Sequence, residues 1–209
     1  IQIAKMHPGV VYAAVGIHPQ QTDPENHDSP AVQIKKLTAL ARQKEIVAIG
    51  ECGLDYSPAP PSEKDRTHKE QFFLFKKQIK LAQKLNLPII IHCRKAFSDI
   101  IEILNQEVNC GLRGVFHCYS AGKKRVEKVN QLGFSTKGGP ASGWYFGVDG
   151  NLTYDVGLQN VFREIPLEKI LLETAAPFLS PEPLRGQRNE PKNVKIIAEC
   201  LAKIRNVSL

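Results

Sequence analysis

Features that mark several classes of protein are scarce or absent in this 209-residue sequence. No stretch approaches the roughly 20 apolar residues of a membrane-spanning helix. The longest apolar runs, such as Leu87–Ile91, have only the length of a strand. The shares of 42% hydrophobic and 23% charged residues exclude a disordered, collagen-like or coiled-coil chain. We therefore expect a soluble globular protein with a sizeable core and no membrane partner.

The cysteines are few and form no closely spaced pair. Five occur, with no Cys-x-x-Cys motif among them: Cys52, Cys93, Cys110, Cys118 and Cys200. An odd, dispersed set does not build the disulfide framework of a small secreted protein. The chain starts at Ile1, and no signal peptide follows that residue. These observations predict a cytoplasmic protein.

The charge is positive but not concentrated in one segment. Lys and Arg number 28 against 21 Asp and Glu, which gives a net charge of +7 and a pI near 9.2. A basic balance is compatible with a polyanionic partner such as nucleic acid. Composition alone favours an ordinary basic surface with no such partner, since long blocks of like charge are absent.

Strand-like and helix-like patterns alternate along the chain. Ser29 and Pro30 are typical of a helix start, and Ser98 is expected to cap another helix. Strands joined by helical crossovers predict a parallel sheet. Six β-branched or apolar runs predict the strands: Val10–Gly16, Ile46–Gly50, Leu87–Ile91, Gly114–Phe116, Tyr145–Val148 and Lys169–Leu172.

The pattern of six strands favours an α/β fold of the (β/α)₈ TIM-barrel type over a doubly wound sheet. No Gly-x-Gly-x-x-Gly turn follows a predicted strand, which weakens a dinucleotide-binding interpretation. A barrel has eight strands and about 250 residues, so we expect a barrel that lacks its first one or two β/α units. Residues 1–209 are predicted to form a single domain, in which Ser135–Gly143 is a surface loop or an insertion.

Four of the predicted strands are followed at once by a residue that can bind metal. These residues are Glu51, His92, His117 and Glu173. Because the carboxyl ends of parallel strands open on one face of a barrel, their side chains are expected to converge there. Carboxylate and imidazole bind divalent ions from Zn²⁺ to Mn²⁺ and Mg²⁺. The alternative is that each is an isolated polar residue at a strand end.

Three cysteines directly follow proposed ligands. Cys52, Cys93 and Cys118 come after Glu51, His92 and His117. Neighbouring residues of a strand point to opposite sides. We therefore expect these thiols to face away from the site as buried structural groups.

Six segments resemble, in chain order, motifs of the TatD family of metal-dependent deoxyribonucleases. The resemblance runs from about Val10 to the C-terminus. Each motif is weak alone, and six in register are specific. They are Gly16–Pro19 (GIHP), Ile49–Tyr56 (IGECGLDY), Pro88–Arg94 (PIIIHCR), Phe116–Ser120 (FHCYS), Leu172–Pro177 (LETAAP) and Arg188–Pro191 (RNEP).

The resemblance implies a metal-dependent (β/α)₈ hydrolase that cleaves DNA phosphodiester bonds without regard to sequence, with no protein partner implied. Glu51 would bridge two divalent ions (Mg, Mn or Zn) and act in catalysis, and His92 and His117 would be ligands of one of them. Asp55 is expected to be a hydrogen-bonding loop residue. Three residues are expected to contact substrate phosphates, although each also suits an ordinary surface position: His18, Arg94 and Arg188.

Two departures from the family pattern count against full activity. No His-x-His pair occurs in the chain, although many members carry one in their first strand. Ala175 stands where the family has an Asp that would bind metal and orient or deprotonate water. Glu173, expected on the same face one pleat away, is the candidate to take over this catalytic role in part. Loss of a general base costs about 10²–10⁴-fold in rate.

Three functions therefore remain open from the sequence. The first is a deoxyribonuclease that uses a metal-activated water and is impaired by Ala175 and by the missing first strand. The second is a metal-dependent hydrolase of a small ester, lactone or amide. The third is a catalytically inactive relative that binds nucleic acid.

Overall fold

The computed structural model describes residues 1–20, 28–58, 66–107, 111–132 and 143–209. The chain divides into two compact units, and each is described by itself. Unit 1 comprises residues 1–114 and 132–143, and unit 2 comprises residues 115–131 and 144–209. Of the expected loop Ser135–Gly143, residues 135–142 lie outside the described part. That residues 1–209 form one domain stays a prediction.

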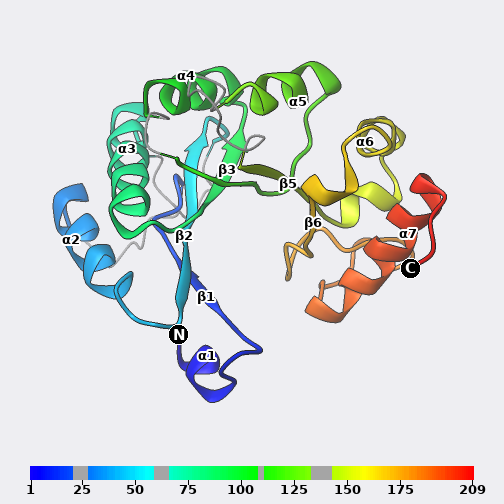
Figure 1. Cartoon of the computed structure of the whole chain (residues 1–209), viewed down its shortest axis with the longest axis horizontal. Coiled ribbons are helices and arrows are strands. Elements are labelled where there is room, and N and C mark those ends of the chain that lie inside the picture. The colour runs from blue at the N-terminus through cyan, green and yellow to red at the C-terminus, as the bar shows by residue number, and fades with distance from the viewer. Residues whose placement is uncertain (21–27, 59–65, 108–110, 133–142) are drawn as a thin grey trace. The chain divides into compact units, whose positions relative to one another are not determined.

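Unit 1 is built on parallel strands with helices beside them (Figure 1). Strand β1 pairs in parallel with β2, and β2 with β3. Helix α3 packs on β2, and α2 packs on α3. The elements are α1 (Gln2–Met6), β1 (Ala13–Val15), α2 (Pro30–Leu40), β2 (Ile46–Asp55), α3 (His68–Leu85), β3 (Ile89–Arg94) and α4 (Phe97–Glu107).

Local sequence explains where the helices of unit 1 begin. The Ser29 side chain accepts a hydrogen bond from the Val32 N–H, and Pro30 occupies the first turn of α2, as predicted. Helix α3 starts at a capping box made by Thr67 and Glu70. The prediction for Ser98 is wrong, because α4 begins at Phe97 and Ser98 is already inside it.

Unit 2 contains most of β4 and everything from β5 onward. Strand β5 pairs in parallel with β6. The Trp144 and Phe146 side chains of β5 are buried, with Phe116 and Tyr119 as ring neighbours. The elements are β4 (Gly114–Phe116), α5 (Lys123–Asn130), β5 (Trp144–Val148), η2 (Gly150–Thr153), α6 (Val156–Phe162), η3 (Leu167–Lys169), β6 (Ile170–Leu172), η4 (Pro191–Asn193) and α7 (Val194–Arg205).

The order of the strands confirms the predicted fold class. The six strands follow one another in the sheet in chain order, β1 to β6. A doubly wound sheet instead reverses its order at a switch point. Each predicted strand run overlaps one strand of the structure. The chain thus has the α/β fold of the (β/α)₈ type, with six strands of the barrel sheet.

Strands β2 and β3 both continue beyond their predicted ends, and β3 runs through His92 to Arg94. β2 was expected to end at Gly50, but it continues to Asp55, so Glu51 lies inside the strand and not after it. The pairing of β2 with β3 shifts register between Ile49 and Cys52, next to Glu51. At Gly53 (φ +152°) an added Cβ would lie 1.9 Å from the His92 carbonyl oxygen, so only glycine permits this strand contact.

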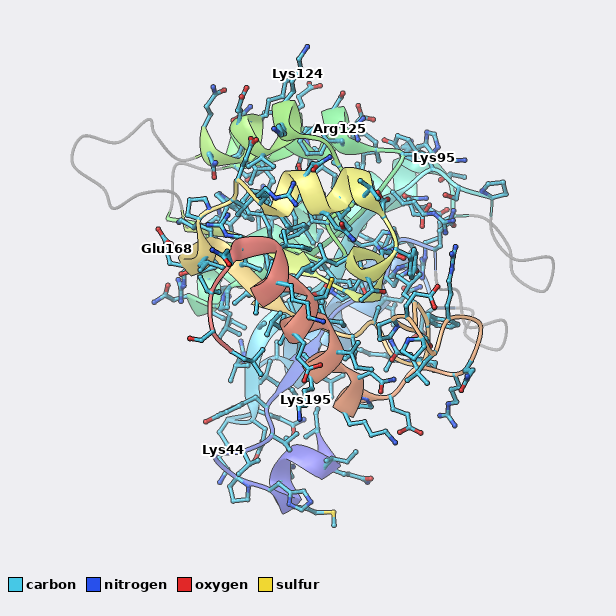
Figure 2. The ribbon with its side chains drawn as sticks, turned by 90° about the vertical axis from the view of Figure 1, so that its right-hand side faces the viewer. Lys44, Lys95, Lys124, Arg125, Glu168 and Lys195 are labelled. Carbon is cyan, nitrogen blue, oxygen red and sulfur yellow. The ribbon has the colours of Figure 1, made fainter. Side chains whose placement is uncertain are left out.

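Basic side chains come from many separate elements (Figure 2). Lys44 precedes β2, Lys95 follows β3, Lys124 lies on α5 and Lys195 on α7, and all four are exposed.

Among the described residues, no helix combines the length and apolar character needed to cross a bilayer.

We predict that Gly53→Ala strongly destabilises unit 1. The added methyl group meets a backbone oxygen, and the φ angle is unfavourable for an L-residue, so the loss should reach about 3 kcal/mol or more. Chemical denaturation followed by circular dichroism measures it. Gly122→Ala is the matched control, because its Cβ would meet nothing within 4 Å. Equal midpoints for both variants would contradict the prediction.

Candidate functional site

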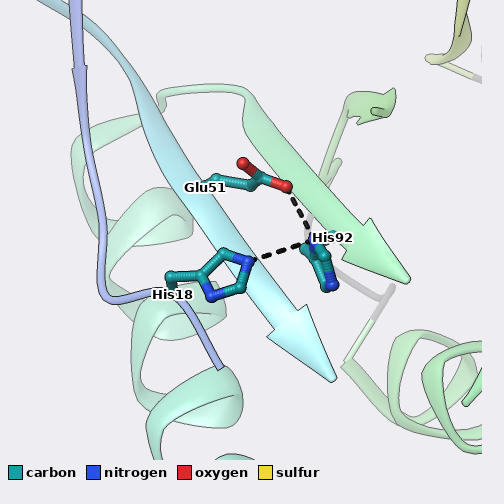
Figure 3. Close-up of side chains that lie close together, drawn as sticks. All are labelled: His18, Glu51 and His92. Atoms are coloured by element: carbon teal, nitrogen blue, oxygen red, sulfur yellow. Dashed lines mark hydrogen bonds and ion pairs between the residues drawn. The ribbon is translucent and has the colours of Figure 1, made fainter. Parts of the chain in front are cut away.

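Three predicted site residues meet in unit 1 (Figure 3). His18 follows β1, Glu51 lies in β2 and His92 in β3. His92 Nδ1 lies 2.8 Å from Glu51 Oε1 and 3.2 Å from His18 Nε2. All three side chains are half-buried, so the cluster is open to a ligand. We call it the His18–Glu51–His92 cluster.

Asp55 supports the cluster from its other side. Its Oδ2 atom lies 2.9 Å from His92 Nε2. Asp55 is buried at 4% exposure, and its Oδ1 accepts the Ser57 N–H at 2.8 Å. Gln71 pairs with the Asp55 backbone through both polar atoms of its amide. Asp55 is therefore the well-held last residue of β2, a hydrogen-bonding residue as expected but not in a loop.

The two carboxylates set the charge of His92 when no metal is bound. Burial alone would lower the pKa of His92, but hydrogen bonds to Asp55 and Glu51 outweigh it and raise the pKa to about 9. Burial likewise opposes ionisation of Asp55, yet hydrogen bonds from His92 and Ser57 lower its pKa to about 2. His92 is then a cation between two acceptors.

His18 differs from His92 in charge and in its proton. Burial, and then the charge of His92, lower the pKa of His18 to about 4, so its ring is neutral near pH 7. The Gln20 N–H donates to His18 Nδ1 at 3.1 Å. This hydrogen bond assigns the ring proton to Nε2, the nitrogen that faces His92. His18 thus presents a donor to the cluster, which suits an anionic oxygen better than a metal ion.

The donor set of this cluster fits a divalent cation. With Asp55 accepting from His92 Nε2–H, deprotonated His92 directs its Nδ1 lone pair toward Glu51 Oε1. A carboxylate behind a ligating imidazole is the usual arrangement at protein metal sites, since it orients the ring and selects the tautomer. Glu51 and His92 would therefore hold the ion, and Asp55 would orient His92.

A second group lies in unit 2, where His117 meets Glu173. Glu173 Oε2 lies 2.6 Å from His117 Nδ1, and Glu173 Oε1 accepts the Cys118 N–H. Cys118 Sγ lies 3.3 Å from His117 Nε2. The prediction that the Cys118 thiol faces away from His117 is wrong. β4 ends at Phe116, and Cys118 has φ +45°, so strand alternation does not apply to this pair.

Glu173 is occupied by these contacts. Both of its carboxylate oxygens accept hydrogen bonds, from His117 and Cys118. The expected common pleat of Glu173 and Ala175 is absent, because β6 ends at Leu172 and Ala175 has φ +49°. Burial raises the pKa of the neighbouring Asp149 carboxyl and of the Cys118 thiol. In this arrangement Glu173 orients His117, as Asp55 orients His92.

The remaining predicted residues lie outside both groups. Arg94 ends β3 with an exposed side chain, and its carbonyl accepts the Tyr56 N–H. Arg188 is exposed in unit 2. Cys52, by contrast, is fully buried, in line with a structural thiol. The sequence analysis assigned no role in the site to Gln20 or to the thiol of Cys118. Asp55 has a signal in the sequence, because it lies an even number of strand residues from Glu51 and such residues share one face of a strand.

A polar cavity of about 270 Å³ adjoins the His18–Glu51–His92 cluster within unit 1. Gln20, Asp55, Ser57 and Arg66 are among its lining residues. Gln20 Oε1 is buried and has no hydrogen-bond partner among the described residues, and Ser57 Oγ is buried as well. The cavity therefore offers an amide oxygen, a hydroxyl and a largely buried guanidinium to a polar ligand.

Comparison with known proteins agrees with the motif resemblance. A family model described as TatD related DNase matches residues 1–209. The Bacillus subtilis protein named uncharacterized metal-dependent hydrolase YabD is 35% identical over 201 residues, which are 95% of this chain and 71% of that protein. The 3'-5' ssDNA/RNA exonuclease TatD of a Pantoea species is 30% identical over 209 residues, covering 98% of this chain and 74% of its own length.

A solved structure of a TatD homolog is also similar to this chain. The crystal structure of YJJV, a TatD homolog from Escherichia coli, superposes with a TM-score of 0.80 at 28% identity. The match covers 99% of this chain and 73% of that one. The family resemblance predicted from the six motifs is confirmed.

We predict that His92 titrates near pH 9 in chelator-treated protein. Because this pKa exceeds the ordinary 6.5, the contribution of His92 to stability is present below pH 6.5 and lost toward pH 9, by at most about 3 kcal/mol. Histidine NMR titration measures the pKa. Asp55→Asn should lower it, while Asp155→Asn, in unit 2, should leave it unchanged. An Asp55→Asn spectrum that titrates like the unmodified protein would contradict the assignment.

Proposed function

This chain belongs to the TatD-related DNase family, and from that premise we propose that it hydrolyses phosphodiester bonds of DNA with the help of divalent metal ions. It is a TatD-family metal-dependent hydrolase. The proposal concerns its substrate, which we infer to be DNA, with a preference for single strands or frayed ends. The observation that carries the proposal is the pair of Glu51 and His92, with Asp55 bonded to the far nitrogen of His92.

Three of the predicted residues would hold the metal ions. They are Glu51, His92 and His117, with Mg²⁺, Mn²⁺ or Zn²⁺ as candidates and two ions in total. Bound ions supply Lewis acidity and lower the pKa of a coordinated water. Asp55 and Glu173 keep the two imidazoles in the tautomer that binds metal.

His18 and the adjoining cavity favour an anionic substrate. The proton assigned to His18 Nε2 is a hydrogen-bond donor that faces the cluster, and a phosphate oxygen is a suitable acceptor. Arg66 and the Ser57 hydroxyl provide further donors in the cavity. Arg94 and Arg188 are proposed to contact flanking phosphates from their exposed positions. Contacts of this kind recognise the phosphate backbone of the nucleic acid and do not distinguish its bases.

The names of relatives support a nucleic acid substrate. The Pantoea relative is named a 3'-5' ssDNA/RNA exonuclease. The +7 net charge also suits a polyanion better than a neutral lactone or amide. A small-molecule ester therefore ranks second and is tested in the same assay.

Ala175 favours a second candidate, a weakened enzyme that still binds nucleic acid. The Asp that the family pattern carries at this position is absent. Glu173 does not replace it freely, because His117 and Cys118 engage both of its oxygens.

We predict that the chain releases nucleotides from single-stranded DNA in the presence of Mg²⁺ or Mn²⁺ and that chelator stops the reaction. His92→Ala should reduce the rate at least about 100-fold, since it removes a proposed ligand. His7→Ala, an exposed histidine outside the cluster, is the control. A folded chain that leaves DNA intact but turns over a neutral lactone would overturn the proposal. Binding of DNA without cleavage would support the weakened relative.

We predict that Ala175→Asp raises the cleavage rate by about 10²–10⁴-fold, because it restores a carboxylate that can bind metal or accept a proton. The backbone accepts this change, since Asp tolerates the left-handed conformation that Ala175 adopts. Ala175→Asn has the same shape without the charge and should give no increase. Equal rates for the two variants would show that this position plays no part in catalysis here.

A further inference from the structure

Gln20 has a buried side chain, 8% exposed, whose amide oxygen has no hydrogen-bond partner among the described residues. Its Nε2 group donates to the backbone carbonyls of Asp55 and Ser57. Turning the amide around would set its oxygen against those two carbonyl oxygens, so these contacts fix the orientation of the amide. Gln20 lines the polar cavity of about 270 Å³. Its Oε1 atom is therefore a fixed acceptor for a ligand in that cavity.

Two other described glutamines of unit 1 are buried, and both are fully paired. Gln71 accepts the Asp55 N–H and donates to the Asp55 carbonyl. Gln78 does the same with the N–H and the carbonyl of Ile17. Buried acceptors in folded proteins almost always have a donor. The cavity is thus matched to a ligand that brings an N–H group to Gln20.

A stacked aromatic pair forms another part of the cavity lining. The ring centroids of Tyr56 and His68 lie 4.0 Å apart with an interplanar angle of 23°, and both residues line the cavity. The Tyr56 hydroxyl donates to Asp99 and the Tyr56 N–H to the Arg94 carbonyl, so the phenol ring is held at both ends. Unpaired nucleic acid bases stack on aromatic side chains and present their edges for hydrogen bonding.

The size and the charges of the cavity favour a base over a phosphate group. Its volume lies just below the range of about 300–1,000 Å³ that is typical of pockets for drug-sized ligands, which suits a single base. Arg66 is buried and attracts an anion, but Gln20 Oε1 and the Asp55 carboxylate repel one. A base satisfies both sides, since its edge offers donors to Gln20 and acceptors to Arg66.

We propose that this cavity binds one nucleobase of the substrate, with Gln20 Oε1 accepting from an exocyclic amino group and with Tyr56 and His68 as the stacking surface. The proposal rests on the proposed function and adds a base preference to it. Adenine and cytosine carry an amino group at the ring edge. Thymine and uracil instead have a ring N–H between two carbonyl oxygens, which would face the oxygen of Gln20.

Gln20 connects this cavity to the candidate metal site. Its backbone N–H donates to His18 Nδ1 at 3.1 Å, while its side chain lines the cavity. Asp55 also belongs to both, since it pairs with His92 and lines the cavity. A base in the cavity therefore lies beside the cluster that would take the adjoining phosphate.

The first test is NMR titration of the chelator-treated full chain with deoxycytidine and with deoxyuridine, which carry an amino group and a carbonyl oxygen, respectively, at ring position 4. We expect deoxycytidine to bind about 10-fold more tightly and to shift the side-chain amide signals of Gln20. Equal affinities, or no binding of deoxycytidine to the folded chain, would overturn the proposal. Competition by inorganic phosphate would also overturn it and would show an anion site instead.

The second test uses variants of the cavity lining. Gln20→Met keeps the length of the side chain, removes the acceptor and should abolish the preference for deoxycytidine. Gln187→Met, at an exposed glutamine of unit 2, should retain the preference. His68→Ala should weaken both nucleosides alike, by about 5-fold or more, since it removes a stacking ring. A folded Gln20→Met chain with the full preference would contradict the role of Gln20, and the first test remains decisive if this variant does not fold.

Both tests separate the base site from the hydrolysis reaction, because nucleosides contain no phosphodiester bond. Cleavage of DNA by a chain that binds both nucleosides equally would retain the proposed function and overturn only the base site. Preferential binding of deoxycytidine without cleavage would do the reverse.

Discussion

The hydrogen bond between His92 Nε2 and the Asp55 carboxylate is the contact on which the candidate site depends, because it decides which ring nitrogen of His92 faces Glu51. The contact requires close pairing of β2 and β3. Gly53 provides that pairing, since any side chain there would meet the His92 carbonyl. Asp55 in turn is held by Ser57 and Gln71. The orientation of the His92 ring thus follows from backbone geometry in unit 1.

Unit 2 repeats the same arrangement with different residues. Glu173 pairs with one ring nitrogen of His117 as Asp55 pairs with one ring nitrogen of His92. The consequence for chemistry is specific. A carboxylate that orients a ligand is not free to act as a base, so Ala175 leaves a function that Glu173 does not fill.

Several elements could be predicted because their signals are local. The helix start at Ser29 and Pro30 depends on a side chain and its own backbone, and the structure confirms it. The six strands were located from apolar runs, and the chain-order sheet followed from their helical connections. The ends of the strands were predicted less accurately. Strand β2 extends five residues beyond Gly50, because its glycines continue the pairing with β3 at a place where glycine residues would suggest a turn.

The sequence by itself determined the fold class, the family and the residue types of the site, because periodicity and short motifs are properties of neighbouring residues. It also placed Glu51, His92 and His117 on separate strands or directly after them. Only the tertiary structure decided the partners: Asp55 for His92, Glu173 for His117, and Gln20 for the proton of His18. These pairings join residues whose distance depends on strand register and on backbone angles such as φ +45° at Cys118, and no local pattern specifies either.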